Sequence, residues 1–152
     1  VKMAKTIEHV SYFKMETPMA AVKLRELVAL GGKDILGPFD GEESITLMAD
    51  LNAGATGTMC SALSPELIKP VLEYFKAGEI DKAKAQYSHI LPLVNFENRQ
   101  CGLRASKTVM FEGGVIKSDY VRHPLTSLHP DTRAELLDLA AERDVIALRW
   151  GK

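Results

Sequence analysis

The sequence predicts an α/β fold in residues 1–78 and helices alone in residues 79–152. In the first part, a short apolar segment typical of a strand is followed by a segment with helical periodicity, and this order occurs three times. Beyond Gly78 the strand-like segments stop and only helical patterns remain. Strands that alternate with helices run parallel and are joined by right-handed crossovers, so we expect one parallel sheet.

The first unit starts with residues 9–15, HVSYFKM, after a short helical segment at the beginning of the chain. These residues are rich in β-branched and aromatic types, which favours a strand buried on both faces. Thr17 is the candidate N-cap and Pro18 the candidate first residue of the helix that follows. That helix covers residues 20–30, and two glycines directly after it are typical of a helix end.

The second and third units repeat this pattern. Residues 34–39 and 55–60 are the expected strands, and residues 42–52 and 64–77 are the expected helices. Ser-Pro at the start of the last helix and Gly78 after it are a typical N-cap and a typical helix end. The first domain is therefore expected to end at residue 78.

The second domain, residues 79–152, is expected to be helical. Apolar residues recur at helical spacing in 79–94, 98–111 and 131–143. Residues 117–129 show no clear period and contain proline, which predicts an extended loop.

The composition excludes several classes of protein. Of the 152 residues, 19 are Lys or Arg and 20 are Asp or Glu, so the charge offers no reason to expect binding to nucleic acid or acidic membranes. Cys60 and Cys101 form no CxxC motif and the histidines have no ligand spacing, so neither a disulfide scaffold nor a metal site is expected. No apolar run approaches the ~20 residues that cross a bilayer. We expect a cytoplasmic protein.

Three charged residues lie at predicted strand ends, where parallel α/β folds bind ligands. Lys14 ends the first strand; partial burial would lower its pKa and favour attack on a carbonyl, although it could also extend its ammonium into water. Glu16 lies two residues later, on the same face of the strand. It could transfer protons during catalysis, or its charge could simply stabilise the N-terminus of the next helix. Asp40 ends the second strand, where it could contact a substrate or cap the following helix.

The segments FKMETP, GPFDGEE and AGATGTM, in this order and spacing, resemble the last three strands of the dihydrodipicolinate synthase and N-acetylneuraminate lyase family. The resemblance continues through NFENRQ, EGGVI and HPDTRAELL, over nearly the whole chain. It implies the C-terminal part of a (β/α)8 TIM barrel, namely its last three strands, followed by a C-terminal helical extension. A complete barrel takes ~250 residues, so the resemblance also implies a chain that begins at Val1 inside the barrel.

The resemblance assigns roles to individual residues. Lys14 stands where the family has its Schiff-base lysine, and Glu16 stands where sugar-acid members face the substrate chain. Asp40 stands where the lyases contact the tail of the sugar acid. Met59 and Cys60 stand near the carboxylate of the keto acid. The implied substrate is a small 2-keto acid, and no cofactor is implied.

The resemblance implies a Schiff-base lyase. The carboxylate of Glu16 favours the sugar-acid dehydratases, which convert a substrate such as L-2-keto-3-deoxyarabonate to α-ketoglutarate semialdehyde. The alternatives are a class I aldolase, and a non-catalytic fragment that serves in packing or assembly. The resemblance further implies a homo-oligomer, dimer or tetramer, and a chain that is inactive without the first five strands.

Overall fold

The computed structural model describes residues 1–152. The chain folds as two compact units, Val1–Cys60 and Ser61–Lys152. The helix at residues 65–76 thus belongs with the later helices, whereas the sequence groups it with the strands up to residue 78. Each unit is described by itself.

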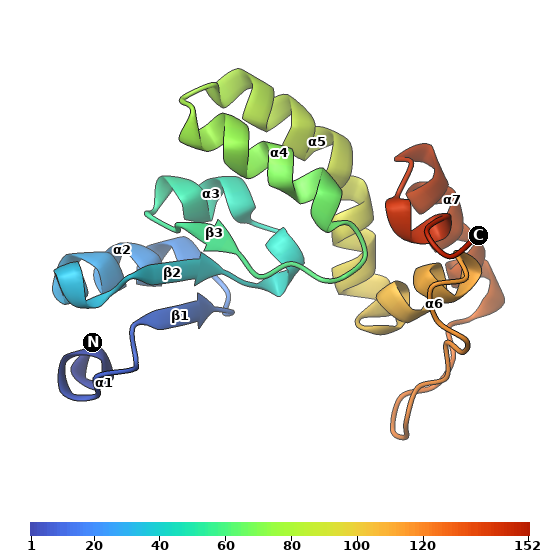
Figure 1. The fold of residues 1–152 in the computed structure, drawn as a ribbon, viewed down its shortest axis with the longest axis horizontal. Helices are drawn as coiled ribbons and strands as arrows, with labels where there is room; N and C mark the ends of the chain where they lie inside the picture. Colours follow the sequence, from blue (N-terminus) through green and yellow to red (C-terminus); the bar gives the residue numbers. More distant parts are fainter. The chain divides into compact units, whose positions relative to one another are not determined.

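The sheet of the first unit has three parallel strands in the order β1-β2-β3 (Figure 1). Their bounds are Tyr12–Met15 for β1, Gly37–Asp40 for β2 and Gly57–Thr58 for β3. In the register of the sheet Met15 pairs with Asp40, and Asp40 pairs with Thr58. The last residues of the three strands therefore lie in one row. The predicted parallel α/β arrangement is confirmed.

Helix α1 precedes the strands, and the other helices and turns of the first unit connect them and provide its core. Their bounds are Lys2–Thr6 for α1, Ala20–Gly31 for α2, Gly32–Asp34 for the 3-10 turn η1, Glu42–Ser44 for the 3-10 turn η2 and Leu47–Asn52 for α3. Leu24 of α2 and Leu47 of α3 are completely buried. The predicted end of the first full helix is confirmed, because α2 stops at Gly31 and Gly32 has a positive φ of 52°.

One predicted helix cap and one predicted helix start are wrong. The helix predicted over 20–30 begins at Ala20 as expected, but its N-cap is Met19, with a left-handed backbone of φ 59°, and neither Thr17 nor Pro18 takes the role predicted for it. The helix predicted from residue 42 begins only at Leu47. The three residues Glu42–Ser44 all have positive φ, which an α-helix of L-residues does not accommodate.

The first strand is shorter and more exposed than the sequence predicts. It lies at an edge of the sheet, and the side chain of Tyr12 is 61% exposed. The ring of Tyr12 stacks on Phe39 of β2, with centroids 6.0 Å apart. The expected burial on both faces is therefore absent, because the side chains of β1 alternate between exposed and half-buried.

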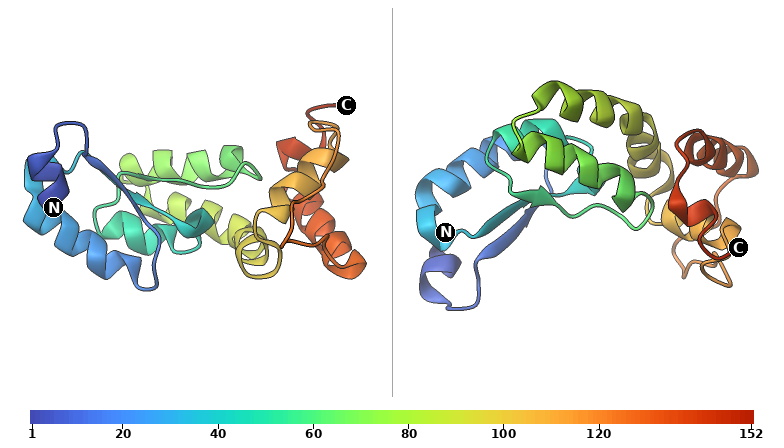
Figure 2. Two further views of the ribbon diagram at one scale, coloured as in Figure 1. Left: turned by 90° about the horizontal axis from the view of Figure 1, so that it is seen from below. Right: turned by 45° about the horizontal axis from the view of Figure 1, so that its top comes forward.

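The second unit is helical, as predicted. Its helices are Pro65–Lys76 for α4, Ile80–Phe96 for α5, Arg104–Glu112 for α6 and Pro130–Glu142 for α7, with a π-helical turn η3 at Glu97–Cys101 and a 3-10 turn η4 at Ile146–Leu148. Helices α4 and α5 run antiparallel side by side around the turn at Gly78 (Figure 2). The helix predicted over 98–111 is divided, because Gly102 adopts a positive φ of 59° between η3 and α6. Residues 117–129 contain no helix or strand, as predicted.

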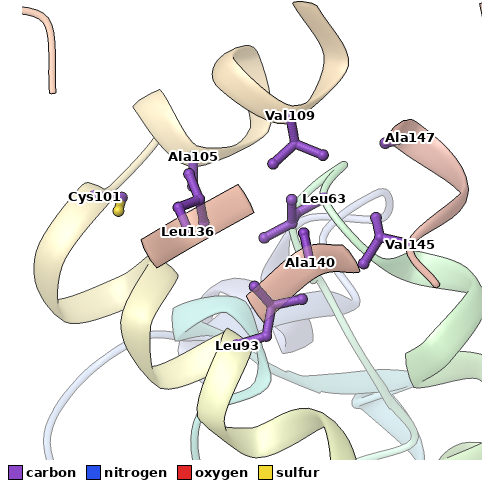
Figure 3. Close-up of a cluster of buried hydrophobic side chains, with 9 residues drawn as sticks. All are labelled: Leu63, Leu93, Cys101, Ala105, Val109, Leu136, Ala140, Val145 and Ala147. Carbon is purple, nitrogen blue, oxygen red and sulfur yellow. The ribbon is translucent and has the colours of Figure 1, made fainter. Parts of the chain in front are cut away.

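An apolar cluster holds the second unit together (Figure 3). It consists of Leu63, Leu93, Cys101, Ala105, Val109, Leu136, Ala140, Val145 and Ala147. The cluster joins α5, α6, α7 and η4 with the segment before α4. Burial raises the pKa of the Cys101 thiol to about 11, which identifies Cys101 as a packing residue and not a reactive thiol.

Truncation of this cluster tests the packing. The side chain of Leu136 is completely buried, so Leu136→Ala removes apolar contacts and leaves a cavity. We expect a loss of about 2–5 kcal/mol in the free energy of unfolding, measured by urea denaturation with circular dichroism. Leu103, 60% exposed, provides the control, and Leu103→Ala should change the value by about 0.5 kcal/mol or less. Equal losses in the two variants would contradict this packing.

Candidate active site

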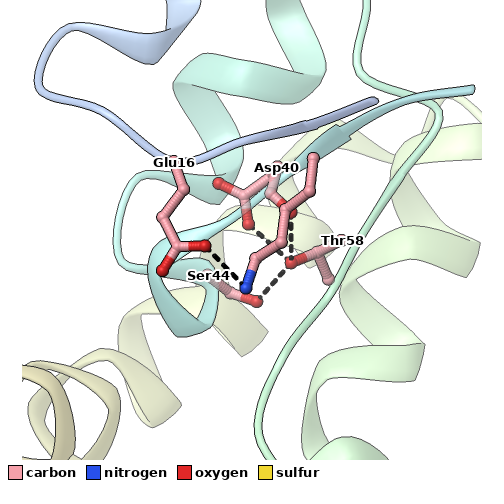
Figure 4. Close-up of polar contacts among 5 residues, drawn as sticks. Glu16, Asp40, Ser44 and Thr58 are labelled. Carbon is pink, nitrogen blue, oxygen red and sulfur yellow. Dashed lines mark hydrogen bonds and ion pairs between the residues drawn. The ribbon is translucent and has the colours of Figure 1, made fainter. Parts of the chain in front are cut away.

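Polar side chains from all three strands meet at the carboxyl edge of the sheet. Lys14, Glu16, Asp40, Ser44 and Thr58 form this strand-end cluster; Figure 4 shows the last four converging on one space. The row formed by the last residue of each strand explains the convergence, since Asp40 and Thr58 are register partners. This edge is where parallel sheets commonly place ligand-binding groups.

Lys14 and Glu16 form an ion pair at the open side of this cluster. Lys14 Nζ lies 2.7 Å from Oε2 of Glu16, and the two side chains are 35% and 48% exposed. The spacing of two residues places both side chains on the same side of the extended segment, as predicted. The pair is partly open to solvent, so a ligand can reach it.

The predicted lowering of the Lys14 pKa is wrong. Its pKa is raised above the ordinary value, chiefly by the hydrogen bond to Glu16. Partial burial acts in the opposite direction but is outweighed, and the charge of Glu43 and that of Asp40 in its ionised form raise the pKa further. The amine is therefore protonated at neutral pH, and a nearby base has to accept its proton before it can act as a nucleophile.

Asp40 lies at the buried side of the cluster and is completely inaccessible to solvent. Its Oδ2 accepts a hydrogen bond of 2.5 Å from the hydroxyl of Thr58. Ser44 Oγ in turn lies 2.8 Å from Oγ1 of Thr58. The alternative that Asp40 caps the following helix is wrong, because η2 separates Asp40 from α3.

Met59 and Cys60 directly follow β3. Met59 is 41% exposed, and its backbone N–H donates to the carbonyl oxygen of Asp40 at 3.0 Å. Cys60 is half-buried. The structure thus places both residues next to the row of strand ends, in line with β3.

The turn after β2 passes close to the backbone at the end of β1. A Cβ on Gly41 would lie 2.7 Å from the carbonyl oxygen of Met15 and 3.0 Å from Cβ of Glu16, so only glycine fits here. Glu42, Glu43 and Ser44 follow with φ values of 49°, 55° and 76°. Consecutive left-handed residues other than glycine cost energy and are concentrated at functional sites.

Ser44 and Thr58 are the site residues that the sequence analysis missed. The signal for Thr58 was its place in AGATGTM, one residue before Met59 on the third predicted strand. Ser44 carried no signal, because EES after a strand is an ordinary beginning of a helix.

The cluster contains groups for acid–base and nucleophilic chemistry.

No three His, Cys, Asp or Glu side chains in residues 1–152 are grouped so that they could hold a metal ion. None of the helices has both the length and the apolar character needed to span a membrane.

Comparison with known proteins relates the whole chain to one family. Residues 11–143 match the dihydrodipicolinate synthetase family. A relative named L-2-keto-3-deoxyarabonate dehydratase, from Azospirillum brasilense, is 57% identical over 149 residues. The match covers 98% of this chain and 48% of the relative, so the chain spans about half the length of that protein.

Solved structures show the same fold. The dihydrodipicolinate synthase of Aquifex aeolicus superposes with a TM-score of 0.84 at 21% identity, over 95% of this chain and 48% of that one. A protein described as a putative dihydrodipicolinate synthetase from Pseudomonas aeruginosa superposes with a TM-score of 0.79 at 26% identity, over 93% and 48%. The match of residues 11–143 and the 57% identity agree with the resemblance noted in the sequence. The chain belongs to the dihydrodipicolinate synthetase family.

Proposed function

We propose that this chain carries the Schiff-base lysine of a lyase that dehydrates a 2-keto-3-deoxy sugar acid, with L-2-keto-3-deoxyarabonate as the substrate. The observation that carries the proposal is the 2.7 Å pair of Lys14 and Glu16 at the end of β1. The 57% identity to the Azospirillum brasilense dehydratase supports the choice of substrate.

Glu16 is the base that can accept the proton of Lys14, whose pKa is raised. Its carboxylate is the hydrogen-bond partner of the ammonium, so it can take the proton and leave a neutral amine. The amine of Lys14 then attacks C2 of the keto acid, and the resulting carbinolamine takes up a proton from solvent and loses water to give a protonated imine. Glu16 is left as a carboxylic acid beside the imine.

The elimination uses the proton that Glu16 has received. The protonated imine withdraws electrons from C3, so a C3 proton is lost to solvent and an enamine forms. The electron pair of the enamine expels the C4 hydroxyl group, which leaves as water after accepting the proton from Glu16. A proton then leaves C5, C3 and C4 are reprotonated, and the C5 hydroxyl group loses its proton to become the aldehyde. Hydrolysis of the imine releases α-ketoglutarate semialdehyde and Lys14. One molecule of water is lost overall.

The remaining predicted residues take supporting roles in this proposal. Met59 and Cys60, next to the strand ends, are assigned to the carboxylate of the substrate, a role supported by the 41% exposure of Met59. A direct contact between Asp40 and the sugar-acid tail stays a prediction. Its side chain is completely buried and bonded to Thr58, which supports a role behind the cluster.

The same proposal includes the rest of a TIM barrel. The sheet contains three strands, the outer edge of β1 is unpaired, and the first unit exposes apolar side chains such as Tyr12, Val22 and Leu36. We therefore propose that turnover requires the first five strands of the barrel. Cytoplasmic location and assembly into a homo-oligomer, both implied by the family, belong to this proposal as well.

Trapping with borohydride tests the role of Lys14. The protein for this test joins the first half of the Azospirillum brasilense relative to these 152 residues. Borohydride with pyruvate should label Lys14, as located by peptide mass spectrometry, because borohydride reduces an imine to a stable amine. Lys14→Arg should abolish the label, whereas Lys23→Arg, an exposed position on α2, should retain it. Label at another lysine would contradict the assignment.

The variant Glu16→Gln distinguishes two roles of Glu16: proton transfer to the substrate, and its effect on the pKa of Lys14. Without the carboxylate the pKa of Lys14 should fall, so trapping should persist and its pH profile should shift to lower pH. Dehydration should slow by about 10²–10⁴-fold, because the acid for the leaving hydroxyl is gone. Steady-state rates and pH-dependent trapping check this split. Unchanged dehydration in Glu16→Gln would exclude Glu16 as the acid.

The products distinguish a dehydratase from an aldolase. L-2-keto-3-deoxyarabonate is incubated with the joined protein and with the 152-residue polypeptide, and α-ketoglutarate semialdehyde and pyruvate are both measured. We expect the semialdehyde from the joined protein, little pyruvate, and neither product from the polypeptide alone. Pyruvate as the main product would favour the aldolase, and turnover by the polypeptide alone would refute the need for the first five strands.

A further inference from the structure

Two carboxyl groups are buried together behind the strand-end cluster. Asp40, at the end of β2, is 0% exposed, and Asp50, in α3, is 1% exposed. Asp50 is a hydrogen-bond partner that raises the pKa of Asp40. Aspartate is rarely buried completely unless it is paired, because an ionised carboxylate loses its hydration.

Each carboxyl group has one oxygen bound and one oxygen without a donor. Oδ2 of Asp40 accepts from Thr58 at 2.5 Å, and Oδ2 of Asp50 accepts from Thr46 at 2.7 Å. The other two oxygens, both Oδ1, are buried and no donor reaches either of them. Two ionised carboxylates would leave both atoms unsatisfied and would also repel each other.

We propose that Asp40 and Asp50 share one proton in the folded protein: Asp40 carries it on Oδ1 and donates it to Oδ1 of Asp50. One proton then satisfies both orphaned oxygens at once. It also reduces the charge of the pair from two to one.

The burial of Asp40 and its hydrogen bond with Asp50 support Asp40 as the acid of the pair. Burial raises the pKa of Asp40 to about 8, the hydrogen bond with Asp50 acts in the same direction, and the bond from Thr58 acts against them. The charged groups facing the pair are Glu42 of η2, which raises this pKa, and Lys14 of β1. Asp40 is thus predominantly protonated at neutral pH.

The shared proton fixes the position of Thr58 and Ser44. The single hydroxyl proton of Thr58 is used toward Asp40, so Ser44 donates to Thr58. Asp40 and Asp50 are therefore positioning residues, which act on the cluster through Thr58. For the chemistry, which rests on the proposed function, a protonated Asp40 at neutral pH removes one of the charges that favour the ammonium form of Lys14.

Carbon-13 NMR of the aspartate carboxyl groups tests the shared proton without substrate. In protein labelled at aspartate Cγ, the Asp40 resonance, identified by its loss in Asp40→Asn, should titrate near pH 8. An Asp40 resonance that titrates near its ordinary value of 3.8 would overturn the proposal. Because this readout uses neither substrate nor turnover, failure of the proposed dehydratase activity leaves it unaffected.

Asp50→Asn provides the decisive variant. The amide that this substitution introduces would donate to Asp40 and favour its ionised form, so the midpoint of Asp40 should move from about 8 toward 3.8. Asp81→Asn, at an exposed position on α5, is the matched control and should leave the midpoint unchanged. An unchanged midpoint in folded Asp50→Asn would overturn the pairing. If this variant does not fold, the wild-type titration decides by itself.

Discussion

The register of three parallel strands is the constraint on which the site depends. Because Met15, Asp40 and Thr58 occupy one row, Lys14 and Glu16 lie on either side of the first position, and the hydroxyl of Thr58 reaches the carboxyl group of Asp40. A shift of one residue in either pairing would turn the side chains of that strand to the opposite face. The geometry of the cluster thus follows from backbone hydrogen bonds, and the side chains add their chemistry to it.

The electrostatics of the cluster differ from those of a lysine activated by burial. Lys14 is bonded to Glu16 and faces the further carboxyl groups of Glu43 and Asp40, and its pKa rises despite partial burial. Such a lysine becomes a nucleophile by transferring its proton to a neighbour. In the mechanism that we propose, the same glutamate then holds the proton that the elimination consumes, so one pair supplies both steps.

Local patterns in the sequence predicted the parts of this site that depend on local structure. The spacing of two placed Lys14 and Glu16 on one face, and the strand–helix alternation predicted a parallel sheet. The bond between Asp40 and Thr58 joins residues 18 apart, and no local pattern reports it. The left-handed turn at Glu42–Ser44 was missed because its residues are typical of a helix start.

The strand-end cluster has a solvent-exposed side, formed by Lys14 and Glu16, and a buried side, formed by Asp40 with Asp50 behind it. Glu16 is 48% exposed and its carboxylate is paired with Lys14, so solvent and ligands can reach it. Asp40 and Asp50 are buried, and one oxygen of each accepts a hydrogen bond from a threonine hydroxyl, Thr58 for Asp40 and Thr46 for Asp50. The number of protons on the buried pair sets the charge behind Lys14, and that charge sets how readily Lys14 releases its own proton to Glu16.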